Sequence, residues 1–104
     1  MNDIADNAGS FLVIVYPQDS SAGALRVLAT ELAAALAKAC TEAPVFVRPN
    51  MTALCLLVHG RFSAIRRAVD DVTDAYSHWL VVPVGTPFAA HGLSTAEQWL
   101  NRHS

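Results

Sequence analysis

Apolar residues fall into seven blocks along the chain, and their spacing predicts the order of helices and strands. Four blocks are β-branched or aromatic runs next to glycine, proline or other turn residues, as is typical of strands: 11–16, 45–48, 52–59 and 79–84. Three others repeat apolar residues every three or four positions, like one face of a helix: 22–39, 64–76 and 94–103. The predicted order is therefore β-α-β-β-α-β-α.

Proline, glycine and serine residues set the predicted ends of these elements. Pro17 ends the first strand, and Pro49-Asn50 forms the turn of a hairpin between the second and third strands. Gly60 is expected to break the third strand. Ser63 is expected to cap the next helix, because a serine hydroxyl accepts a hydrogen bond from the first helical turn.

The order of elements predicts an α/β fold of the α+β type. The first four strands and two helices match the split βαβ pattern of ferredoxin-like folds. Right-handed crossovers then give an antiparallel sheet of order 4-1-3-2 with both long helices on one face. We expect a ferredoxin-like βαββαβ fold with an extra C-terminal helix, in which residues 1–9 form a flexible tail and 10–104 a single domain.

Three of the strands are apolar on both faces, although the two long helices cover one face alone. The chain is 53% hydrophobic and 15% charged, and exposed apolar surface is unfavourable by about 25 cal/mol per Å². The last helix can cover part of the second face and a second copy of the chain the rest, so we expect a homodimer. The alternative is a monomer in which the C-terminal segment covers the whole face. The expected interface residues come from the strands and the last helix: Phe11, Val13, Cys55, Leu57 and Trp99.

Charge and cysteine content narrow the expected partners and location. The net charge of −2 gives no general attraction to nucleic-acid phosphates, although a local basic patch leaves nucleic acid open as a partner. The apolar run 11–16 is far too short to span a membrane, and the polar, acidic first ten residues lack the basic flank of a signal peptide. Cys40 and Cys55 form no paired framework, so we expect a cytoplasmic protein without a membrane partner.

Several stretches carry a resemblance to a known family. They are a first strand ending in Tyr16, "MTALCLLV" before "SAIRRAVDDV", "SHWLVVPVG", and the tail "AAHGLSTAEQWLNRH" with its spacing of Gly85, Gly92 and Trp99-Leu100. Together they resemble the SinR-like family of small ferredoxin-like proteins, distant relatives of the small CRISPR-associated nuclease of the adaptation complex. The resemblance implies the ferredoxin-like fold and dimerisation.

The chain departs from that family where the nuclease chemistry lies. In the nuclease relatives an aspartate directly follows the first-strand tyrosine and supports a divalent metal at the dimer axis. Here Pro17 occupies that position, and Asp19 is the nearest acid. An aromatic residue usual before the tail glycine is also missing, since Ala90 and His91 stand there. The resemblance therefore extends to fold and assembly and leaves nuclease activity in doubt.

Asp19 is the runner-up catalytic residue. The predicted topology could gather it with Gln18, Asn50 and His78 at one end of the sheet. A hard metal such as Mg²⁺ needs several oxygen ligands, usually including more than one carboxylate, and one chain supplies one here. The alternative, which we favour, is that Asp19 or one of the two serines after it caps the first long helix.

A weak anion-binding site is predicted at the start of the second long helix, because helix N-termini bind anions. Its residues are His59, Arg61, Arg66 and Arg67. The alternative is that Arg66 and Arg67 form solvated ion pairs with the aspartates four positions further on.

No other pattern indicates a reaction. The four histidines share no metal-ligand spacing, the cysteines form no CxxC, and "VGTP" has too few glycines for a phosphate loop. We expect no catalytic centre, metal or cofactor, and a binding or interaction module is the expected function. The alternatives are a metal-dependent nuclease with a displaced carboxylate at Asp19, and a small-ligand sensor that uses the apolar sheet face.

Overall fold

A computed structural model describes residues 7–19, 21–47, 53–85 and 94–103. The elements in chain order are β1 (Ala8–Tyr16), α1 (Ala22–Ala39), β2 (Val45–Val47), β3 (Leu54–Arg61), α2 (Phe62–Val72), β4 (His78–Pro83) and α3 (Ser94–Arg102). The four strands form one antiparallel sheet of order β2-β3-β1-β4. The predicted ferredoxin-like order is thus confirmed, read from the opposite edge.

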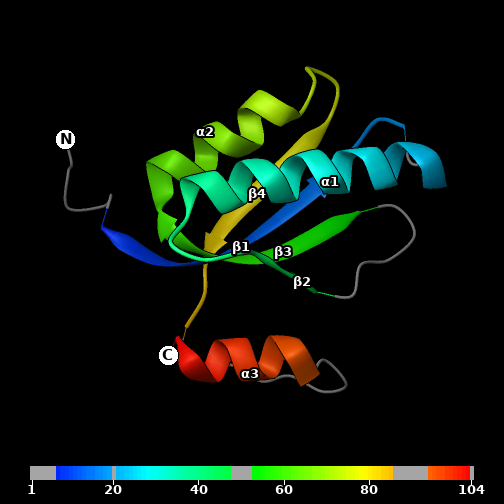
Figure 1. Cartoon of the computed structure of the whole chain (residues 1–104). Helices are drawn as coiled ribbons and strands as arrows, with labels where there is room; N and C mark the ends of the chain where they lie inside the picture. Colours follow the sequence, from blue (N-terminus) through cyan, green and yellow to red (C-terminus); the bar gives the residue numbers. More distant parts are fainter. Residues whose placement is uncertain (1–6, 20, 48–52, 86–93, 104) are drawn as a thin grey trace.

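The helices lie on both faces of the sheet, so the molecule has three layers. Helices α1 and α2 pack side by side on one face, and α3 lies on the other (Figure 1). We call these the helix-pair face and the second face. Among the described residues, no helix is long and apolar enough to cross a membrane.

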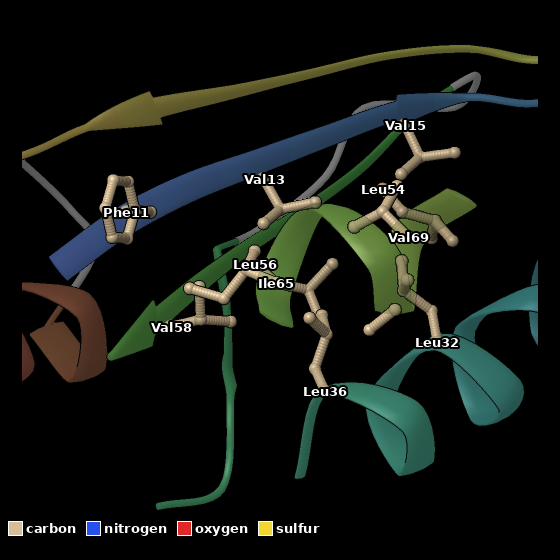
Figure 2. Close-up of a cluster of buried hydrophobic side chains, with 11 residues drawn as sticks. Phe11, Val13, Val15, Leu32, Leu36, Leu54, Leu56, Val58, Ile65 and Val69 are labelled. Carbon is tan, nitrogen blue, oxygen red and sulfur yellow. The ribbon is translucent and has the colours of Figure 1, made fainter. Parts of the chain in front are cut away.

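The main core lies between the sheet and the helix pair. Alternate residues of β1 and β3 point toward α1 and α2, as the two-residue repeat of a strand requires (Figure 2). The fully buried side chains include Val13 and Val15 of β1, Leu56 and Val58 of β3, Leu32 and Leu36 of α1, and Ile65 and Val69 of α2. Burial of each such side chain stabilises the fold by about 1.5–3 kcal/mol, so this layer fixes the sheet on the helix pair.

The register corrects two of the predicted interface residues. Val13 pairs with Leu56, and both face the helix pair, whereas Leu12 pairs with Leu57 on the second face. Phe11 and Val13 are 8% and 0% exposed in the main core, so neither has surface to offer a partner on the second face. A shift of one residue along a strand moves a side chain to the opposite face.

Several element ends also differ from the prediction. Strand β1 begins at Ala8, inside the predicted tail, and β3 continues through Gly60 to Arg61. Helix α2 begins at Phe62, with Arg61 rather than Ser63 as its N-cap. The predicted hairpin turn at residues 49–50 lies outside the described residues.

Helix α2 ends at Val72, four residues before the predicted end. The Thr73 hydroxyl donates a hydrogen bond to the Val69 carbonyl. One carboxylate oxygen of Asp74 then accepts from the Tyr76 backbone N–H and from the Ser77 hydroxyl, at 2.9 and 3.0 Å. These local hydrogen bonds stabilise a turn where the helix would otherwise continue.

Candidate functional site

Helix α3 covers one half of the second face. Its Trp99 is 1% exposed and forms a small core with Ala96 and with Leu57 of β3. The partly buried residues around this core come mainly from the β2–β3 side of the sheet: Leu12, Val45, Val47, Val84 and Leu100. The sequence-based expectation that the last helix covers part of this face is consistent with this packing.

The other half of the second face, on β1 and β4, carries an apolar strip. Ile14 pairs with Leu80 and Leu12 with Val82, so Ile14, Leu80 and Val82 share the face of α3, as does Tyr16 at the end of β1. Leu80 is 52% exposed and Tyr16 48% exposed, while Ile14 and Val82 are half-buried. We call Ile14, Tyr16, Leu80 and Val82 the open strip. An exposed apolar group of this kind is typical of an interaction surface.

The remaining predicted interface residues lie at different depths. Leu57 of β3 and Trp99 of α3 are buried against each other where α3 packs on the sheet. Cys55 pairs with Ile14 and lies at the margin of the open strip, half-buried. Burial raises the pKa of the Cys55 thiol, so this cysteine is held in its neutral form. The sequence analysis did not single out Tyr16 and Leu80, the residues that remain exposed on the second face.

Asp19 lies in the turn that leads into α1. One of its carboxylate oxygens accepts a hydrogen bond from the Ser21 N–H at 3.0 Å. Ser21 is the N-cap of α1, and its hydroxyl accepts from the Ala24 N–H at 3.3 Å. The hydrogen bonds from Ser21 lower the pKa of Asp19, so the carboxylate is ionised and already engaged by the backbone.

A hollow of about 400 Å³ lies beside this turn, and three carboxylates line it, those of Asp19, Glu31 and Asp74. Asp74, like Asp19, already accepts local hydrogen bonds, and these bonds lower its pKa. In the described part of the chain, no group of three His, Cys, Asp or Glu residues could hold a metal ion. Gln18 also lines the hollow. His78 pairs with Tyr16 at the end of β4, and Asn50 lies outside the described residues.

The four residues of the predicted anion site lie on different layers. His59 contacts His103, the residue after α3, on the second face, whereas Arg67 lines a groove between α1 and α2. Arg61 and Arg66 are exposed at the start of α2. The sheet therefore lies between His59 and Arg67. Anion binding at the start of α2 stays a prediction, and it concerns the arginines rather than His59.

The structure instead brings His59 into a polar cluster that the sequence did not reveal. Its Nδ1 lies 2.9 Å from the Ser10 hydroxyl, and its ring centroid lies 4.9 Å from that of His103. His103 in turn contacts Glu42, with 3.0 Å between Nε2 and a carboxylate oxygen. We call Ser10, Glu42, His59 and His103 the histidine cluster. It joins residues from β1, from β3, from the connection after α1 and from the turn after α3.

Comparisons of the chain with protein-family models, with curated proteins and with solved structures find no match.

Proposed function

We propose that the protein is a non-catalytic interaction module that forms a homodimer through the open strip. The observation that carries the proposal is the 52% exposure of Leu80 on a sheet face of which α3 covers the other half. Its neighbours Ile14 and Val82 extend the same apolar surface, and a contiguous exposed apolar surface, unlike a single exposed apolar residue, marks an interaction site.

A second copy of the chain suits this surface. An interface with two-fold symmetry must be self-complementary. An apolar strip without charged residues meets that requirement, because two copies of it can pack together without burying a charge. Stable interfaces bury about 800 Å² per partner, which is more than four side chains supply. The interface would therefore also include the edge of β4 and the flank of α3. The resemblance to SinR-like proteins supports dimerisation as well.

The test is the oligomeric state of paired variants. In sedimentation velocity at micromolar concentration, we expect the wild-type chain to be a dimer and Leu80→Asp to be a monomer. Val27→Asp is the matched control, because Val27 is a 59% exposed aliphatic residue on α1, on the opposite face of the sheet. We expect Val27→Asp to remain a dimer. A monomeric wild-type chain would contradict the proposal, and so would a Leu80→Asp variant that still dimerises.

The second candidate is a metal-dependent nuclease with Asp19 as the displaced carboxylate. The hollow lined by Asp19, Glu31 and Asp74 favours it, because two-fold assembly could bring further carboxylates nearby. The involvement of Asp19 and Asp74 in backbone hydrogen bonds argues against it. Cleavage assays on the wild-type chain and on Asp19→Asn separate the two candidates.

A further inference from the structure

Both ring nitrogens of His103 face oxygen acceptors. Nδ1 lies 2.8 Å from the Trp99 carbonyl oxygen, and Nε2 lies 3.0 Å from a carboxylate oxygen of Glu42. A carbonyl cannot donate, and neither can an ionised carboxylate. A neutral imidazole has one N–H and serves one acceptor, whereas an imidazolium serves two. The geometry therefore fits His103 in its protonated form.

The surroundings of His103 favour a positive charge for three further reasons. The ring stacks on the indole of Trp99, with centroids 4.0 Å apart and planes 20° apart, so the cation lies against a π face. His103 directly follows the last residue of α3, where the negative end of the helix dipole lies. The hydrogen bond from His103 also lowers the pKa of Glu42, which keeps this carboxyl group ionised.

Two neighbouring side chains oppose that preference. Arg102 of α3 lies 3.7 Å from the other Glu42 oxygen and shares the carboxylate. His59 of β3 packs beside His103 and contacts the Ser10 hydroxyl of β1, so a second imidazolium there would repel the first. Within the described residues, these are the titratable and charged groups that face His103: Glu42 from the α1–β2 connection, Arg102 from its own helix, and His59 from β3.

We propose that His103 is a pH-sensitive latch that fastens α3 over the second face. As an imidazolium it joins the end of α3 to Glu42, which follows α1 in the chain. When it loses the proton, one of the two bonds is lost, and a ring nitrogen lone pair faces the carboxylate instead. Histidine is the side chain that can change charge between pH 5 and 8, so α3 is held less tightly when this ring is neutral than when it is charged, and a larger fraction of molecules then has α3 undocked.

Undocking has a specific structural result. It uncovers Trp99 and Leu57, and the surface beneath α3 then joins the open strip into one apolar face. The latch itself lies within one chain. Its effect on partner binding rests on the proposed function, because the enlarged face would hold a partner more extensively than the strip alone.

The experiment measures hydrogen exchange of the α3 amides between pH 6 and 8.5, corrected for the intrinsic exchange rates. It uses the Leu80→Asp background, so that failure or success of dimerisation does not affect the reading. We expect α3 protection to fall about three- to tenfold over this range, which corresponds to losing one partly exposed charged pair. Protection of α1 should stay constant, because the main core lies on the opposite face.

Substitutions of His103 and Glu42 test whether this pair causes the pH dependence of α3 protection. In His103→Gln and in Glu42→Gln, α3 should be less protected at pH 6, and its protection should no longer depend on pH. In His103→Arg, which keeps a cation at every pH, protection should remain at or near the pH 6 level throughout. Glu31→Gln is the control for Glu42→Gln, because Glu31 is an exposed carboxylate on α1 remote from the cluster. Unchanged α3 protection from pH 6 to 8.5 would overturn the proposal, as would a full pH response in His103→Gln.

Discussion

Gly60 of β3 faces Cys40 across an antiparallel bridge, in a closer contact than a side chain at this position would normally make. A Cβ on Gly60 would lie 3.2 Å from both the Cα and the Sγ of Cys40. Cys40 is the C-cap residue of α1, so this contact joins the end of the helix to the sheet. The glycine that was predicted to break the strand is instead needed inside it, for close approach of two backbones.

Two glycine substitutions should therefore have opposite signs. Gly60→Ala should destabilise the fold by about 1–3 kcal/mol, because a methyl group 3.2 Å from the Cα and the Sγ of Cys40 requires the backbone of Cys40 to shift. Gly23→Ala should stabilise it by up to about 1 kcal/mol, because Gly23 lies in α1 and a Cβ there meets nothing within 4 Å. Urea unfolding measures both. A neutral Gly60→Ala would show that Cys40 can move away without loss.

Trp99→Ala should remove the side chain that anchors α3. Since Trp99 is 1% exposed, the expected loss is about 3–5 kcal/mol in the free energy of unfolding. Tyr76→Ala is the control, because Tyr76 is an aromatic residue with 69% exposure, and its removal should be nearly neutral. Equal thermal midpoints for the two variants would mean that α3 adds nothing to stability.

Asp19→Asn and Ser21→Ala separate a turn residue from a catalytic one. Ser21→Ala should reduce stability by about 0.5–2 kcal/mol, since it removes the N-cap hydroxyl of α1. Asp19→Asn should change stability by less than about 1 kcal/mol, because an amide oxygen still accepts from the Ser21 N–H.

The same Asp19 variant tests the nuclease alternative. We expect the wild-type chain to show no Mg²⁺ or Mn²⁺ binding by calorimetry and no metal-dependent cleavage of single- or double-stranded RNA or DNA. Cleavage by the wild-type chain that disappears in Asp19→Asn, with the fold intact, would make the nuclease the better assignment.

Acid stability should depend on Glu42. Its pKa is lowered in the folded chain, chiefly by the hydrogen bond from His103 and also by the charges of His103 and Arg102. A lowered folded pKa means that this contribution is complete above the ordinary value of 4.5 and is lost as the pH falls through the folded value. Urea midpoints from pH 6 to pH 3 should therefore fall less in Glu42→Gln than in the wild-type chain. Glu31→Gln should follow the wild-type curve, and an identical curve for Glu42→Gln would contradict the pairing.

The sequence predicted the elements better than their contacts. The apolar repeat from Leu25 to Ala39 predicted α1 with its observed bounds, Ala22–Ala39, because helix spacing is a local signal. The assignment of Phe11 and Val13 to the second face was wrong, because alternation along a strand does not say which set faces the helices. Which set faces the helices follows from the strand register, and the register depends on pairing between distant segments of the chain.

The histidine cluster could not be predicted for the same reason. Ser10 and His59 are 49 positions apart, and Glu42 and His103 are 61 apart. No local spacing connects them, so His59 was grouped with the arginines that follow it in the chain. Its actual neighbours are Ser10 of β1 and His103, the residue after α3, which the fold brings together.

The position of α3 makes it an intramolecular competitor for its own half of the sheet. It belongs to the same chain as the strands that it covers, so its concentration at this surface does not depend on the concentration of the protein. Any partner that binds the surface beneath α3 must displace a ligand that is always present and never diffuses away. The threshold for binding there is therefore set by the docking strength of α3, whereas the open strip has no such threshold.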